Sequence, residues 1–212
     1  MTRLYAIAEG QSEAAFITQI LKPHLEDRRA GLVEVFAPRL SGHHTFARLS
    51  WEVRNCLGKP DADTVVTTMI DLYRIARDFP GLTEPLNDAP AQKRVLHLEG
   101  RFNEEIGDRR FRPYIQVHEF EALLLTNLTV LADQYPTFRK ELKELAERLN
   151  KQFGTPEEVD RDMPPSRRIL QVVPEYDKIL DGVAALTKIG LPALRARCPH
   201  FAEWCNFLET VS

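Results

Sequence analysis

The chain has 212 residues, of which 43% are hydrophobic and 28% are charged, and its formal net charge is -3. This length supports one sizeable core, or a core with a small appendage, and the composition is that of an ordinary globular protein. The slightly acidic balance excludes a globally basic nucleic-acid-binding surface, so any basic groove must be local.

The sequence gives no sign of membrane insertion or export. No apolar run approaches the length of a membrane span, and an apolar segment follows Met1-Thr-Arg directly, so we expect neither a membrane helix nor a signal peptide. The three cysteines, Cys56, Cys198 and Cys205, are odd in number and lack Cys-x-x-Cys spacing. That usage favours a reducing, cytoplasmic location.

The first segment joins an apolar run to two acidic residues. Residues 4–8 predict a buried strand, and Glu9 and Gly10 follow at once. Gly10 permits the tight turn with which a strand enters a helix, which is predicted over residues 12–25. Glu13 lies about one helical turn beyond Glu9. We therefore expect both carboxylates at the carboxyl end of the strand, where ligands bind in open α/β sheets. Alternatively, Glu13 only complements the helix dipole.

Strand and helix patterns then alternate along the chain. Further strands are predicted over residues 32–37, 64–70 and 111–117, and further helices over 45–57, 89–106 and 118–125. The alternation predicts an α/β core over residues 1–125, a mostly parallel four-stranded sheet flanked by helices. Residues 126–212 predict a C-terminal helical extension packed on that core, with helices over 136–153, 177–188, 191–197 and 199–211 and another that Ser166 opens as its N-cap.

Three of the four predicted strands end in acids: Glu9, Asp71, and the pair Glu119 and Glu121. Parallel strands bring their carboxyl ends to one edge of the sheet, so these residues are expected to converge. Carboxylates so arranged favour a hard cation, Mg²⁺ or Mn²⁺. Glu9 would be a ligand or general base and Asp71 the anchoring ligand, with Glu13, Glu119 and Glu121 completing the shell. The alternative is helix capping and local salt bridges.

A second set of residues is suited to contacting nucleic acid. Arg167, Arg168 and Arg112 could line a groove for phosphates, or could be solvated surface arginines. Tyr73 could stack on a base or simply pack, and His118 could orient a carboxylate, act as a base, or be structural.

A zinc site is a further alternative near the carboxyl terminus. Cys198-Pro-His200 with Cys205 provides zinc-type ligands, but a fourth ligand and the usual spacing are absent.

Several motifs together carry a family resemblance, and they span nearly the whole chain. They are Glu9-Gly-Gln-Ser-Glu13, Met69-Ile-Asp-Leu-Tyr73, Asp78-Phe-Pro-Gly81, Pro113-Tyr-Ile-Gln-Val-His-Glu-Phe-Glu121, Pro165-Ser-Arg-Arg168 and Cys198-Pro-His-Phe201. This combination resembles a prokaryotic family of Toprim-like domains of unknown function, related to the Toprim domains of OLD-type nucleases, topoisomerases and primases. The resemblance implies a Toprim-like fold in which the first-strand glutamate is a general acid/base or metal ligand and acids after the third strand bind metal. It also implies a defence or mobile-element locus, often beside an ABC/SMC-type ATPase.

The chain departs from the Toprim pattern at one position. Toprim enzymes usually carry Asp-x-Asp after the third strand, whereas this chain has Asp71-Leu-Tyr73. Asp78, or Glu119 and Glu121, could replace the missing ligand.

The leading expectation is a cytoplasmic Mg²⁺-dependent nuclease or other phosphoryl-transfer enzyme that acts on DNA or RNA in phage defence. The alternative is a non-catalytic Toprim-like subunit that binds and regulates a partner ATPase. A third possibility is a small-nucleotide sensor that uses the same crevice.

Overall fold

The computed structural model describes residues 2–28, 33–40, 45–59, 63–84, 89–159 and 162–211. Its centre is a parallel sheet with the strand order β2-β1-β3-β4, in which β5 also pairs with β3. The strands are β1 (Thr2–Ala8), β2 (Val33–Phe36), β3 (Thr64–Asp71), β4 (Phe111–Arg112) and β5 (Ile115–Gln116). All the pairings in this sheet of described residues are parallel, which confirms the predicted α/β class.

The fourth predicted strand is interrupted. The sequence predicted one strand over residues 111–117, but β4 ends at Arg112 and β5 begins at Ile115. Pro113 has no N–H to donate to a ladder. The next amide, that of Tyr114, donates instead to Thr68 Oγ1 at 3.0 Å. The break therefore follows from one proline, and the pairing with β3 resumes beyond it.

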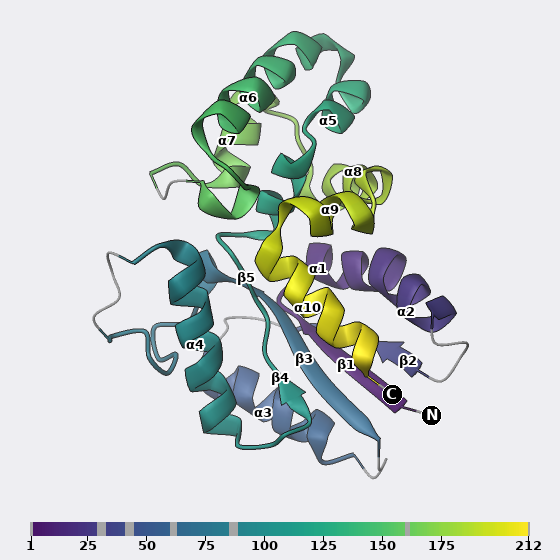
Figure 1. Cartoon of the computed structure of the whole chain (residues 1–212), viewed down its shortest axis with the longest axis vertical. Helices are drawn as coiled ribbons and strands as arrows, with labels where there is room; N and C mark the ends of the chain where they lie inside the picture. The colour runs from purple at the N-terminus through teal and green to yellow at the C-terminus, as the bar shows by residue number, and fades with distance from the viewer. Residues whose placement is uncertain are drawn as a thin grey trace.

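Helices cover both faces of the sheet (Figure 1). On one face lie α3 (Phe46–Leu57) and α4 (Ala91–Ile106), which pack on Tyr5 and Ile7 of β1. On the other face lie α1 (Gln11–Phe16), α2 (Lys22–Arg28) and α10 (Pro199–Thr210), whose core includes Leu4, Ala6 and Ala8. The period-two alternation of β1 thus divides its side chains between two cores.

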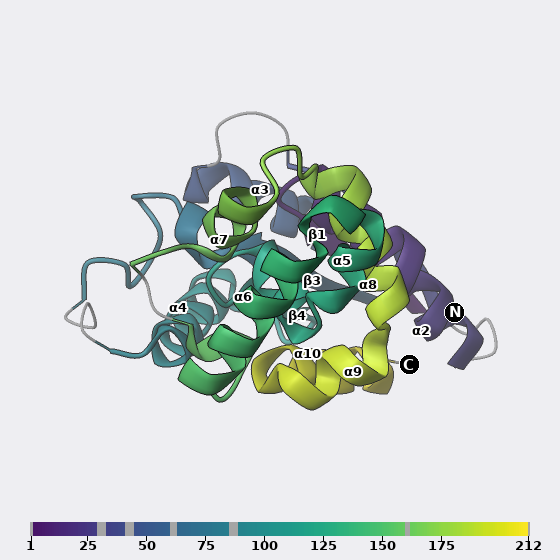
Figure 2. The same cartoon turned by 90° about the horizontal axis from the view of Figure 1, so that it is seen from above.

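The remaining helices gather beyond the carboxyl end of the sheet. They lie above it in Figure 1, and Figure 2 shows α5 and α6 over β1 and β3. They are η3 (Phe120–Thr126), α5 (Thr129–Gln134), η4 (Pro136–Phe138), α6 (Arg139–Gln152), η5 (Pro156–Glu158), α7 (Pro165–Val172), η6 (Lys178–Gly182), α8 (Val183–Ile189) and α9 (Leu191–Arg197), while η1 (Ile17–Leu21) joins α1 to α2 and η2 (Leu72–Arg74) follows β3.

One predicted helix type and one predicted N-cap differ from the structure. Residues 120–126 form a 3-10 helix rather than an α-helix. Ser166 is not an N-cap, because Pro164 holds that position and Pro165 is the first helical residue of α7. Proline is well suited to the first turn, since its fixed φ matches the helix and its missing N–H has no partner there.

The helical extension shares a core with the sheet. Phe16 of α1 lies edge-on to Phe120 of η3 and to Phe201 of α10, with ring centroids 6.0 and 5.9 Å apart. Trp204 of α10 donates its Nε1–H to Thr67 Oγ1 of β3 at 2.9 Å. Segments from both ends of the chain therefore pack on the same sheet face. None of the helices in the described ranges is long and apolar enough to cross a membrane.

Candidate functional site

The adjacent ends of β1 and β3 bring Glu9 and Asp71 together. The two strands pair in register up to Ala8 and Met69, and the Glu9 amide donates to the Met69 carbonyl at 3.0 Å. Glu9 Oε2 in turn accepts a hydrogen bond from the Asp71 amide at 2.7 Å. The parallel pairing thus places the two acidic residues side by side.

Gly10 lets the chain turn from β1 into α1 close to Glu13. A Cβ at position 10 would lie 2.9 Å from Glu13 Oε2, so a side chain there would displace that carboxylate. Burial is the main cause of the raised pKa of Glu9, and the charge of Glu13 nearby raises it further. The Glu-Gly-x-x-Glu spacing therefore positions both acids toward the same space.

A lysine from the helical extension lies among the acids. Lys178 Nζ is 3.3 Å from Glu13 Oε1, 3.4 Å from Asp71 Oδ2 and 3.3 Å from Glu121 Oε2. Burial lowers the pKa of Lys178, but the three carboxylates outweigh that effect and the net pKa is raised. The ammonium group is thus charged and lies between three acidic side chains. We call Glu9, Glu13, Asp71, Glu121 and Lys178 the carboxylate cluster.

The acids of the carboxylate cluster are buried and incompletely paired. Burial raises the pKa of Glu9, Asp71 and Glu121 above their ordinary values, and the Asp71 side chain is only 2% exposed. Three of their oxygens, Glu9 Oε1, Asp71 Oδ1 and Glu121 Oε2, have no hydrogen-bond partner among the described residues. Glu121 Oε2 lies next to Lys178 and Glu9 Oε1 lies next to Arg74, so Asp71 Oδ1 is the one of these three oxygens with neither kind of partner among the described residues. A buried carboxylate oxygen without a partner is costly, so the cluster favours further positive charge.

The donor set consists of carboxylate oxygens, the ligands that a hard divalent cation prefers, and Asp71 Oδ1 has no hydrogen-bond partner among the described residues. In the described part of the chain, however, no three acidic, histidine or cysteine side chains already have the spacing of a metal site. The Lys178 ammonium lies between Glu13, Asp71 and Glu121 instead.

A small cavity borders the cluster on the α3 side. Its volume is about 20 Å³, and its lining includes Glu9, Asp71, Arg74, Phe46 and Phe79. A cavity of this size holds about one water molecule. Arg74 lies at this end of the site with its guanidinium 3.6 Å from Glu9 Oε1, and its side chain is 70% exposed. An exposed arginine next to buried acids can reach a phosphate group that approaches the cluster.

The two acids after β5 point in different directions. Glu121 joins the carboxylate cluster, whereas Glu119 accepts a hydrogen bond from the Ser166 amide at the start of α7. Asp78 likewise points elsewhere, because its side chain accepts from the Phe46 amide at the start of α3 at 3.0 Å. Both side chains thus accept hydrogen bonds at the starts of helices, and their expected role as metal ligands stays a prediction.

Two of the three arginines expected at a nucleic-acid groove, Arg168 and Arg112, make contacts away from the cluster. Arg168 is buried, donates to the Met163 carbonyl at 2.9 Å and stacks on the Phe153 ring at 5.8 Å. Arg112 is exposed, and its strand partner is Thr67. Thr67 lies four residues before Asp71, which is about 13 Å along the strand from the cluster. Arg167 is exposed on the first turn of α7. Its contact with nucleic acid stays a prediction.

Tyr73 and His118 form a hydrogen-bonded pair beside the site. The Tyr73 hydroxyl and His118 Nδ1 are 2.7 Å apart, and His118 Nε2 is 3.1 Å from the Glu157 carbonyl oxygen. His118 is fully buried and has a positive φ of 65°, which is unusual for a residue other than glycine. Strained backbone of this kind is concentrated near functional sites. The structure thus gives both side chains a defined position, while their contact with substrate stays a prediction.

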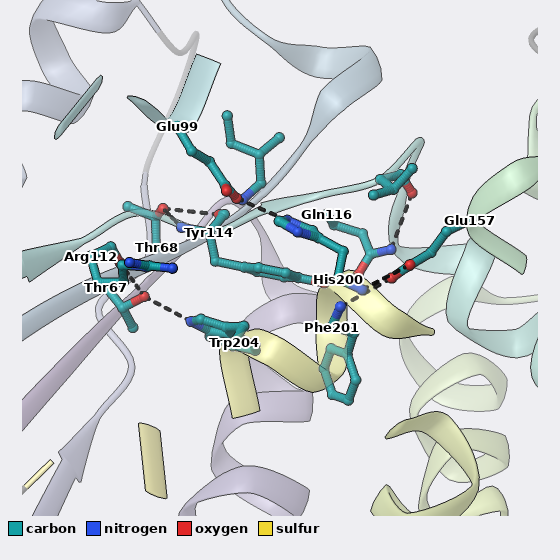
Figure 3. A network of polar contacts seen from close by, with 12 residues as sticks. Thr67, Thr68, Glu99, Arg112, Tyr114, Gln116, Glu157, His200, Phe201 and Trp204 are labelled. Carbon is teal, nitrogen blue, oxygen red and sulfur yellow. Dashed lines mark hydrogen bonds and ion pairs between the residues drawn. The ribbon is translucent and has the colours of Figure 1, made fainter. Parts of the chain in front are cut away.

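A separate polar network anchors α10 to the sheet (Figure 3). His200 Nε2 contacts Glu99 Oε1 of α4 at 3.0 Å, and the His200 ring stacks on Tyr114 with centroids 5.2 Å apart. Glu157 accepts hydrogen bonds from the His200 and Phe201 amides at 2.9 and 3.0 Å, which caps the start of α10. The Cys198-Pro-His200 motif therefore serves packing in this structure, with its histidine directed at Glu99.

We expect this network to make stability depend on pH. Burial lowers the pKa of His200, but Glu99, with Glu157 and Glu203 nearby, outweighs burial and raises the net pKa above 6.5. A raised histidine pKa stabilises the fold fully below pH 6.5, and that contribution is lost as the pH rises through the folded value. His200→Gln should therefore lower the melting temperature more at pH 6 than at pH 9. Parallel melting of His24→Gln, a surface histidine that contacts Glu209, controls for loss of an imidazole. An equal loss at both pH values would contradict this assignment.

Lys178 and Arg74 are the residues of this site that the sequence did not reveal. Lys178 is 107 positions from Asp71 and stands in no motif. Arg74 directly follows the Asp71-Leu-Tyr73 segment, and its position next to a predicted ligand could have indicated that it belongs to the site.

The fold and site together define an α/β protein with a buried carboxylate cluster at the carboxyl edge of a parallel sheet. Residues 8–209 match the family described as Domain of unknown function (DUF4276), and the chain belongs to that family. No curated protein has a significantly similar sequence.

Solved structures of one bacterial protein region are similar to this chain. They are of the C-terminal region of the Xanthomonas campestris pv. campestris OLD protein, phased with iodine, mercury and platinum. The iodine structure has 13% identity and a TM-score of 0.40, covering 98% of this chain and 97% of that one. The mercury structure has 13% identity and a TM-score of 0.44, covering 98% of each chain. The platinum structure has 14% identity and a TM-score of 0.41, covering 97% and 95%.

Proposed function

We propose that this protein is a metal-dependent phosphoryl-transfer enzyme, a nuclease that uses Mg²⁺ or Mn²⁺ to hydrolyse DNA or RNA. One observation carries the proposal: four acids from three separate segments meet at the sheet edge, and three of their buried oxygens lack a hydrogen-bond partner among the described residues. Such an excess of buried negative charge is costly for the fold alone and is useful for holding a cation.

The residues of the cluster have distinct roles in this proposal. The Asp71 amide fixes one oxygen of Glu9, and the other oxygen, Oε1, is the one that would bind an ion. Glu9 Oε1 accepts no hydrogen bond from the described residues, and the Arg74 guanidinium lies 3.6 Å from it. Asp71 Oδ1 is the second donor, and Glu13 and Glu121 supply further negative charge. A bound divalent ion would lower the pKa of a water molecule and neutralise charge on the transferred phosphate.

Positive side chains around the cluster position the substrate. Arg74, exposed beside Glu9, is placed to hold a phosphate oxygen, and Arg167 is the exposed arginine on α7. Lys178 partly neutralises the acids so that an anionic backbone can approach. The cavity beside Glu9 and Asp71 provides room for about one water molecule next to the proposed ligands.

The direct test is cleavage of plasmid DNA, single-stranded DNA and RNA by the purified chain with Mg²⁺ or Mn²⁺. We expect cleavage that EDTA abolishes and that Glu9→Gln lowers by about 10²-fold, the usual cost of removing a preorganised catalytic group. Glu147→Gln, an acid exposed on α6, is the matched control and should leave cleavage unchanged.

The opposite result would be no cleavage of any substrate, or cleavage that is the same in wild type and Glu9→Gln. The non-catalytic alternative, a subunit that regulates a partner ATPase, would then take its place. An ABC/SMC-type ATPase partner and a role in phage defence belong to the proposal through the sequence resemblance alone.

A further inference from the structure

We propose that Lys178 is a built-in cation that permanently takes one ion position in the carboxylate cluster, so that the site binds a single divalent ion between Glu9 and Asp71. This deepens the proposed function and rests on it for the use of that ion. In this proposal, Lys178 is the residue that sets the number of divalent ions that the site binds.

The distances place the Lys178 ammonium where a bridging metal would otherwise lie. Its Nζ is 3.3–3.4 Å from one oxygen each of Glu13, Asp71 and Glu121, which belong to α1, β3 and η3. An ion that bridged these acids would overlap the ammonium, and two cations in one such space would repel each other strongly.

The turn that carries Lys178 is held in place by its own side chains. Lys178 opens a π-helical turn, η6, and π-turns are frequent at functional sites. The Asp177 carboxylate accepts from the Ile179 and Leu180 amides, each at 2.8 Å, and the Asp177 amide donates to Asp181 at 2.9 Å. Lys178 Nζ also lies 5.4 Å from the centroid of the Phe120 ring. The backbone of the turn and the ammonium group of Lys178 are therefore both held in place by neighbouring residues.

The oxygens that Lys178 leaves unpaired are sufficient for one ion. Lys178 contacts Asp71 through Oδ2, whereas Asp71 Oδ1 and Glu9 Oε1 have no hydrogen-bond partner among the described residues. The exposed Arg74 side chain, 3.6 Å from Glu9 Oε1, can move aside for an ion.

The experiment counts bound Mn²⁺ by calorimetry and by electron paramagnetic resonance. Wild type should bind one Mn²⁺ per chain. Lys178→Arg keeps the charge and should also bind one, whereas Lys178→Gln removes it and should bind two. If Lys178→Gln is unstable without metal, Mn²⁺ should raise its melting temperature more than it raises that of wild type, because the ions replace the lost charge.

Two ions in wild type would overturn the assignment of Lys178, as would one ion in Lys178→Gln or an equal Mn²⁺ response in that variant and wild type. The readout is separate from catalysis. One bound ion without cleavage would remove the nuclease proposal and leave this assignment standing. Cleavage by wild type with two bound ions would support the nuclease proposal and overturn the assignment of Lys178. The absence of bound Mn²⁺ would contradict both proposals.

Discussion

Asp71→Asn is expected to be more stable than wild type and inactive in metal-dependent cleavage. Burial raises the pKa of Asp71 well above its ordinary value, and the nearby charges of Glu13, Glu9 and Glu121 raise it further, whereas the contact with Lys178 lowers it. Removing one of four acids lowers the excess negative charge while Lys178 keeps Glu13 and Glu121. Relief of such a site is worth about 1 kcal/mol. For a chain of this length, that raises the melting temperature by about 2–4 °C.

The sign of this stability change separates a metal site from an ordinary structural salt bridge. In a balanced buried pair, loss of either partner destabilises the fold. Here we expect Asp71→Asn to stabilise, whereas Lys178→Gln should destabilise by up to about 3 kcal/mol, because it leaves Glu13, Asp71 and Glu121 without the lysine that contacts them. Thermal melting in EDTA compares the variants, with Glu147→Gln as the exposed control. If Asp71→Asn is less stable than wild type, Asp71 serves mainly as an ion-pair partner of Lys178 that holds the helical extension on the sheet.

In Phe201→Ala, we expect the sheet and the helical extension to unfold in a single thermal transition at a lower temperature than in wild type. Phe201 is fully buried on α10, and its ring lies edge-on to Phe16 of α1 at 5.9 Å and to Tyr114 at 6.3 Å. Truncation of a buried phenylalanine costs about 3–5 kcal/mol, and each kcal/mol lowers the melting temperature by about 2–4 °C. Since both parts share one core, a single transition should move down as a whole.

The matched control for this substitution is Phe207→Ala on the same helix. Phe207 is half-buried and carries the Arg112 guanidinium over its ring at 5.7 Å, so its truncation should cost much less. Calorimetry and circular dichroism of both variants give the comparison. Two separate transitions, with only one of them shifted by Phe201→Ala, would instead support independent units over residues 1–125 and 126–212.

The parallel sheet and the Glu9–Asp71 pair were predictable because each depends on local patterns. Apolar runs that end in acids predict strand ends, and adjacent parallel strands bring those ends together. The shell around the pair was less accessible. Whether Glu119 or Glu121 faces Asp71 depends on a 3-10 turn that helical periodicity does not reveal. Lys178 comes from the helical extension, and its contact depends on how that extension folds back over the sheet edge.

The most direct measurement is the anomalous diffraction of a crystal soaked in Mn²⁺. We expect one peak within coordination distance of Glu9 and Asp71, with Lys178 still in contact with Glu13 and Glu121. Mn²⁺ bound elsewhere in the crystal with no peak between Glu9 and Asp71 would contradict this expectation.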